Sequence, residues 1–177
     1  MDDAGYSGFT LFELLLTLSL VAFLAGTAVP AMRQFIDRQR LQGAAEALSQ
    51  ELKQARNHAL TYQKPVFFSL NSTAQTWCYG WSDEARCDCR SGGIHDCSSH
   101  SVDGVTPHEN DSQNFPSTRL QLNRSASQSL IRFSPVRATA TAQSLQLSNS
   151  TGEIHVIVSP LGRIRLCAPG MGRYVPC

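Results

Sequence analysis

The first 77 residues contain no cysteine, and the first 32 contain no lysine or arginine. An ordinary cleavable signal peptide begins with a basic segment, continues with a shorter apolar core and ends at a small-residue site. The leader from Met1 to Gly8 lacks that basic start, and the apolar run from Leu14 to Met32 carries no charge. At about 20 residues, this run is long enough to cross a bilayer as one helix. The sequence therefore favours an anchor that stays on the protein.

Known catalytic patterns are also missing. The chain has no G-x-S-x-G, no H-E-x-x-H and no glycine-rich phosphate loop. Asp103, Asn110 and Asp111 do not have the spacing of a calcium-binding loop. We therefore expect no enzymatic activity, no cofactor and no metal.

Charge is distributed unevenly although the formal net charge is only +1. Between residues 78 and 116, seven acidic residues stand against two arginines. From Arg119 to the end, seven arginines stand against Glu153 alone. A basic segment of this kind indicates either an anionic partner or simply a solvated face of a sheet.

Residues 33–62 have a helical pattern. Apolar residues recur at spacings of three and four, and polar residues fill the other faces. The apolar stripe comprises Leu41, Ala45, Leu48, Leu52, Ala55 and Ala59. No break separates it from the apolar run, so one helix of roughly 80 Å is predicted from Phe9 to about Thr61. Pro30 predicts a kink or local melting inside it.

The rest of the chain reads as strands separated by turns. The predicted strands are 65–70, 76–81, 118–122, 129–133, 144–147, 153–159 and 163–166, and the last two form a hairpin. Residues 82–117 are rich in polar turn formers and predict a long, irregular loop. The fold class is therefore α+β: a long N-terminal helix packed on a mostly antiparallel sheet, with loops pinned by disulfides.

Six cysteines behind a membrane segment indicate disulfides in an oxidising compartment. Cys167 and Cys177 are isolated from the others, so we pair them. Two further bridges are then expected within one cluster, with a direct bond between its second and third members disfavoured by strain. This cluster comprises Cys78, Cys87, Cys89 and Cys97. A zinc site using His95 or His100 is the alternative, although the spacing does not match the common C-x2-C pattern.

The segment from Gly8 to Glu13 and the apolar run behind it resemble the class III signal of type IV pilins and type II secretion pseudopilins. The resemblance implies that a prepilin peptidase cuts between Gly8 and Phe9 and methylates the new amino terminus. It also implies that Glu13 neutralises that amine in a neighbouring subunit. The simpler alternative places Glu13 in the first helical turn, near lipid headgroups, where the helix dipole favours a carboxylate.

Two further patterns resemble the GspH/FimT domain of minor pilins. The segment from Trp77 to Asp83 is similar to W-x-x-G-W-x-x-x-D with one residue fewer, and Gly162 to Arg165 matches G-R-x-R. The implied organisation is a leader (1–8), a transmembrane half-helix (9–32), an amphipathic half-helix (33–62) and a β-rich domain (63–177) with a Cys-rich loop (82–117).

Some FimT-type pilins bind DNA through G-R-x-R during natural transformation. The resemblance therefore implies a DNA surface formed by Gly162, Arg163, Arg165 and Arg173, with a turn glycine and solvated arginines as the alternative.

We predict a FimT/FimU-type minor pilin in the bacterial inner membrane, with its domain in the periplasm before assembly into a pilus or pseudopilus. Its expected partners are other pilins, the membrane, the prepilin peptidase and double-stranded DNA. The alternatives are a GspH-type pseudopilin of type II secretion and a membrane-tethered domain unrelated to filaments.

Overall fold

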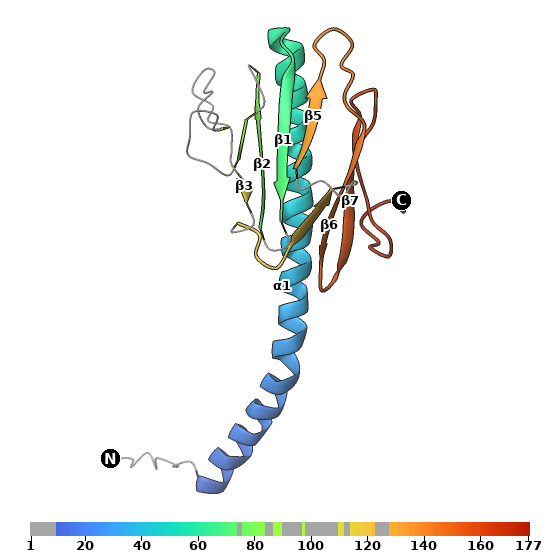
Figure 1. Cartoon of the computed structure of the whole chain (residues 1–177). Helices are drawn as coiled ribbons and strands as arrows, with labels where there is room; N and C mark the ends of the chain where they lie inside the picture. Colours follow the sequence, from blue (N-terminus) through green and yellow to red (C-terminus); the bar gives the residue numbers. More distant parts are fainter. Residues whose placement is uncertain are drawn as a thin grey trace, which may run out of the picture. The chain divides into compact units, whose positions relative to one another are not determined.

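The computed structural model describes residues 10–73, 76–83, 87–89, 97, 110–111, 114–122 and 128–177. One helix, α1 (Leu11–Tyr62), precedes all the strands (Figure 1). The strands are β1 (Val66–Ser72), β2 (Trp77–Ser82), β3 (Asn110–Asp111), β4 (Arg119–Leu122), β5 (Gln128–Phe133), β6 (Gln143–Asn149), β7 (Gly152–Val158) and β8 (Ile164–Cys167). The chain divides into two compact units, Met1–Ile36 and Asp37–Cys177.

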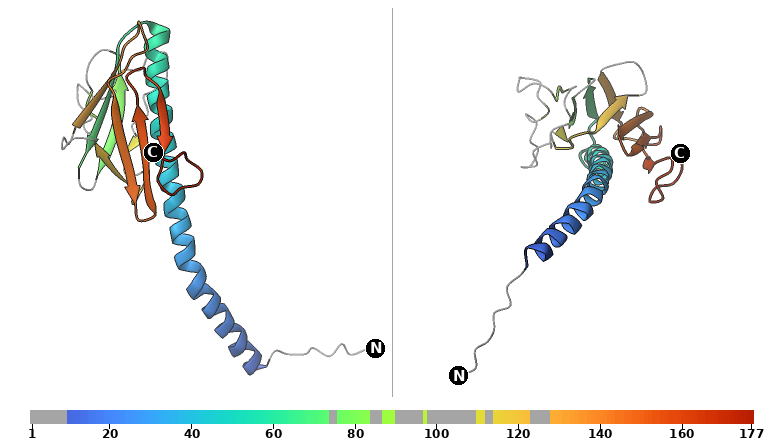
Figure 2. Two further views of the ribbon diagram at one scale, coloured as in Figure 1. Left: turned by 90° about the vertical axis from the view of Figure 1, so that its right-hand side faces the viewer. Right: turned by 90° about the horizontal axis from the view of Figure 1, so that it is seen from below.

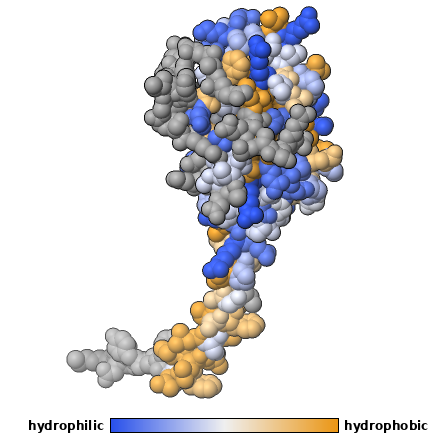
Figure 3. All heavy atoms as spheres, viewed as in Figure 1, coloured by the Kyte–Doolittle hydropathy of each residue, from blue (hydrophilic) through white to orange (hydrophobic). Residues whose placement is uncertain are grey.

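The first unit contains the apolar start of α1. The backbone N–H of Glu13 donates a 3.3 Å hydrogen bond to Oγ1 of Thr10, which caps the helix. The helix continues through Pro30, as expected, and of the two alternatives predicted there, a kink or local melting, local melting does not occur. Its most apolar window of 18 residues has a mean hydropathy of 2.1, and none of that window is buried. Apolar side chains are exposed along this segment (Figure 3), and α1 is long and apolar enough to cross a membrane.

The second unit holds two antiparallel sheets beside the remainder of α1 (Figure 2). One sheet has the order β3-β2-β1-β5, and the other has the order β4-β6-β7-β8. This confirms the α+β class and the antiparallel pairing, but it corrects the expectation of a single sheet. Alternation of apolar residues specifies which face of a strand is buried, and it does not specify which strands become neighbours.

The predicted apolar stripe of α1 lies in the core. All six of its residues are fully buried, together with Ala44. The stripe belongs to one hydrophobic cluster with residues from both sheets, including Phe68 of β1 and Val156 of β7. Burial of each large apolar side chain contributes about 1.5–3 kcal/mol, so the stripe joins this half of α1 firmly to the sheets.

The last two strands form the predicted hairpin, with Val158 paired to Ile164. Arg163 precedes β8 and belongs to the turn, whereas the sequence placed it inside the strand. The expected irregular loop 82–117 also needs correction, because β3 lies within it and pairs with β2. Two polar residues give no hydrophobic alternation, so the sequence carried no strand signal there.

Candidate functional site

The predicted processing site lies at the amino-terminal end. Gly8 and Phe9 lie outside the described residues. Glu13 is exposed in the first turn of α1, where the helix dipole favours a negative charge. This position agrees with both interpretations of Glu13, and its role toward a neighbouring subunit stays a prediction.

The turn between β7 and β8 presents the G-R-x-R segment. The N–H of Gly162 donates to the carbonyl oxygen of Ser159 at 2.9 Å, and the N–H of Ser159 donates to the carbonyl oxygen of Arg163 at 3.0 Å. The N–H of Arg163 donates to Oγ of Ser159, also at 3.0 Å. Gly162 has a φ of 69°, a left-handed conformation that favours glycine. These hydrogen bonds and the left-handed conformation of Gly162 together stabilise the turn.

Gly162 also allows this turn to pack closely. A Cβ atom at this position would lie 2.1 Å from the carbonyl oxygen of Ala138 and 3.0 Å from Nε of Arg56. Glycine is thus required twice here, by conformation and by space. The absence of a side chain allows the turn to lie against α1, and no sequence pattern indicated that contact.

The four predicted DNA-binding residues do not form one group. Arg163 and Arg165 are exposed and make no ion pair among the described residues. Arg173 instead lies 3.2 Å from Oε1 of Glu46 on α1. Its charge is therefore already compensated within the chain.

Tyr174 shares the contact that Arg173 makes. Its hydroxyl donates a 3.1 Å hydrogen bond to the same oxygen of Glu46. Burial raises the pKa of Tyr174 above its ordinary value of 10.0, and the hydrogen bond and the charge of Glu46 raise it further, while Arg173 lowers it. These contacts dock the carboxy-terminal loop on α1.

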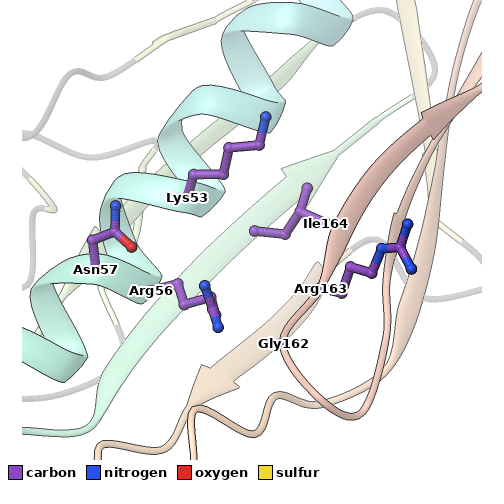
Figure 4. Close-up of a pocket in the computed structure, with 6 residues that line it drawn as sticks. All are labelled: Lys53, Arg56, Asn57, Gly162, Arg163 and Ile164. Atoms are coloured by element: carbon purple, nitrogen blue, oxygen red, sulfur yellow. The ribbon is translucent and has the colours of Figure 1, made fainter.

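A pocket of about 370 Å³ lies between α1 and the β7–β8 turn (Figure 4). Its lining comprises Lys53, Arg56, Asn57, Gly162, Arg163 and Ile164. Lys53 and Arg56 contribute cationic side chains from α1, and none of the lining residues is acidic. In Figure 4 the Arg56 guanidinium extends from α1 toward the turn, whereas the Arg163 side chain extends away from α1. The wall of the pocket that α1 forms is therefore positively charged.

The part of this pocket that α1 forms was not predicted from the sequence. Lys53 and Arg56 were assigned only to the polar faces of the amphipathic helix. Their spacing of three residues places both on one side of a helix, which was the available signal. Nothing in the sequence indicated that this side faces Gly162.

The predicted aromatic motif joins β2 to α1. Trp81 Nε1 donates to Oε2 of the buried Glu51 at 3.2 Å. Oδ2 of the buried Asp83 lies 3.5 Å from both His58 Nε2 and Lys64 Nζ. The ring centroid of His58 also lies 4.4 Å from that of Tyr62 and 5.0 Å from that of Trp81. Trp81 of β2 and Asp83, which follows that strand, therefore have a structural role, because both contact residues of α1.

All six cysteines form disulfides. Cys167 pairs with Cys177, as expected from the sequence. Within the cluster, Cys78 pairs with Cys89 and Cys87 with Cys97, and the disfavoured direct Cys87–Cys89 bond is absent. The zinc alternative is wrong because no cysteine remains free to ligate a metal. His95 and His100 lie outside the described residues.

Comparisons with known proteins identify the domain. The family model described as "Type II transport protein GspH" matches residues 44–162. The type IV minor pilin FimU of Pseudomonas aeruginosa is a similar solved structure, with 17% identity and a TM-score of 0.48, covering 73% of this chain and 97% of that one. The minor pseudopilin EpsH of the Vibrio cholerae type 2 secretion system has 13% identity and a TM-score of 0.49, covering 75% and 99%.

Among curated proteins, no sequence relative was found. The family match spans more than half of the chain and includes most of the buried part of α1, strands β1 to β7 and the turn as far as Gly162. The chain therefore belongs to the GspH family.

Proposed function

We propose that this protein is a minor pilin or pseudopilin that enters a filament through its amino-terminal helix. The observation that carries the proposal is an exposed apolar start of α1, long enough to cross a bilayer, on a chain of the GspH family. An apolar helix surface that is exposed in the isolated chain is stabilised by lipid before assembly and by neighbouring helices afterwards. The precursor is cut between Gly8 and Phe9 by the prepilin peptidase, and the globular unit faces the periplasm of the bacterial inner membrane.

Glu13 is the residue on which assembly depends. A carboxylate at the start of an apolar helix is costly when the surrounding filament is dry, unless a cation is near. The new amine of Phe9 on a neighbouring subunit supplies that cation. The charge, rather than the size of the side chain, is what the proposal requires.

The test compares Glu13→Gln with Ser19→Ala in cells that make the filament. Both residues are exposed in the same apolar segment, and Ser19 carries no charge. We expect both variants to reach the membrane fraction, and only Glu13→Gln to be lost from sheared filaments. Normal recovery of Glu13→Gln in filaments would refute the role of the charge.

The filament is a type IV pilus on the FimT/FimU interpretation and a type II secretion pseudopilus on the GspH interpretation. Deletion of the gene separates them, because the first predicts loss of pili and the second predicts loss of secreted proteins with pili intact. We favour the pilus, on the terminal G-R-x-R segment and its turn geometry.

DNA capture is a second candidate function. It is favoured by the exposed side chains of Arg163 and Arg165, which have no acidic partner among the described residues. The matched control is Arg173→Gln, because Arg173 is already paired with Glu46. Double-stranded DNA binding that falls steeply with salt, and that Arg163→Gln with Arg165→Gln abolishes, supports this function. Binding that survives the double substitution refutes it.

A further inference from the structure

The pocket beside Gly162 concentrates positive charge without compensation. Lys53, Arg56 and Arg163 all line it, and none of the three makes an ion pair among the residues that the structure describes. The Arg163 side chain extends away from α1, whereas Lys53 and Arg56 lie three residues apart on the helix and their like charges repel one another, which raises the free energy of the unliganded state. An arrangement of this kind is relieved by an anion.

A second observation points into the same pocket. Nε of Arg56 is buried and has no hydrogen-bond partner. A buried N–H donor without an acceptor costs about 1–3 kcal/mol, and more when the group is charged. Gly162 lies against this nitrogen and contributes no side chain that could accept the hydrogen bond. An anion in the pocket would supply the acceptor oxygen that this N–H lacks.

The shape and charge of the site select the ligand. We propose that the pocket binds a terminal phosphate monoester, with Arg56 and Lys53 of α1 on one wall and the turn at Gly162 on the other. A phosphate monoester carries about 1.5–2 negative charges near pH 7 and three acceptor oxygens, which matches the two cations of α1. A phosphodiester within a strand carries one charge, and its two substituents make it harder to bring into a recess. The amide of Asn57 supplies further donors at the rim.

This inference stands apart from the proposed DNA surface. It assigns function to two helical residues, Lys53 and Arg56, and it assigns none to Arg163 or Arg165. The ligand is the phosphorylated end of a molecule rather than the side of a duplex. Two sources supply this chemistry, namely the phosphorylated end of a nucleic acid strand and free inorganic phosphate.

The test uses the mature, oxidised full chain in detergent micelles. Fluorescence anisotropy measures binding of one short single-stranded oligonucleotide, labelled at its 3′ end, with either a 5′-phosphate or a 5′-hydroxyl. We expect about tenfold tighter binding of the phosphorylated form, because charge-assisted hydrogen bonds to one extra phosphate are gained. Inorganic phosphate should remove this preference by competition.

Variants locate the site. Lys53→Gln and Arg56→Gln should each reduce the 5′-phosphate preference, and Arg119→Gln should leave it unchanged, since Arg119 is exposed on β4 and does not line the pocket. Lys53 is exposed, so its substitution leaves the fold intact even if Arg56→Gln proves unstable. Inorganic phosphate that binds through Lys53 and Arg56 without any oligonucleotide preference supports the pocket and identifies free phosphate as its source.

Failure has a clear form. If neither inorganic phosphate nor the 5′-phosphate binds in a manner that depends on Lys53 or Arg56, the inference is overturned. That result would not contradict the other two proposals, which are duplex binding through Arg163 and Arg165 and filament assembly through Glu13. The three proposals therefore fail separately.

Discussion

Gly80 of β2 should not tolerate even a methyl group. It is paired with Ser69 of β1, and a Cβ atom built on it would lie 2.6 Å from Cβ and 2.7 Å from Sγ of Cys97. Cys97 is fully buried and bonded to Cys87, so it cannot rotate away. The expected effect of Gly80→Ala is therefore a steric conflict with the disulfide cluster.

The magnitude follows from two opposing terms. Overpacking a well-filled core costs about 1–3 kcal/mol. Replacing glycine with alanine where the backbone conformation permits it contributes about 0.4–1 kcal/mol of stability through the unfolded chain. The backbone of Gly80 permits alanine, since Gly80 is not among the described glycines with positive φ. The difference between the two terms is a net loss of about 0–2.6 kcal/mol with a central value of about 1.3 kcal/mol, or a few degrees in Tm.

Thermal unfolding under oxidising conditions measures this loss. Gly172→Ala is the matched control, because nothing lies within 4 Å of its built Cβ and its stability should be unchanged or slightly raised. In the background of Cys87→Ala with Cys97→Gly, both clashing atoms are gone, so the penalty of Gly80→Ala should largely vanish. A penalty of equal size in that background would show that the conflict with Cys97 is not the cause.

Three further outcomes are expected. Leu52→Ala removes a fully buried side chain of α1 and should cost about 2–5 kcal/mol in urea unfolding. Removing the last disulfide by Cys167→Ser with Cys177→Ser should cost about 2–3 kcal/mol in the same assay, because it closes a short loop. Tyr174 holds its proton more tightly in the folded state, so its contribution is complete below pH 10.0 and is lost as pH rises beyond that value. The stability of Tyr174→Phe, measured by urea unfolding across alkaline pH, should therefore fall less steeply there than that of the unaltered protein, whose tyrosinate would face Glu46.

The helix could be predicted because its signal is long and local. The apolar residues of the stripe repeat over five turns, and every one of them is buried. The β7–β8 hairpin was predictable for a similar reason, since alternating residues flank a short turn with glycine. In both places the pattern that predicts the element lies in residues close together in the sequence.

The pocket could not be predicted because its two walls are far apart in the chain. Lys53 and Arg56 meet Gly162 only after α1 has packed on both sheets. The pairing of the clustered cysteines has the same origin, since spacing excluded one bond but allowed two arrangements of the rest. Sheet membership likewise depends on neighbours that a strand's own residues do not specify.

The arginines of the carboxy-terminal third illustrate why composition alone was insufficient. They looked equivalent in the sequence, yet Arg173 meets Glu46, while Arg163 extends away from α1 and belongs to a turn that lies against Arg56. The order of charges along α1 therefore decides which arginine stabilises the fold and which stays available for a ligand. An exposed pair such as Arg173–Glu46 contributes only about 0–1 kcal/mol, so its main effect is to remove one cation from the binding surface. We therefore expect any anionic partner of this protein to contact both α1 and the β7–β8 turn. Substitutions confined to the arginine-rich segment would leave the cations of α1 untested.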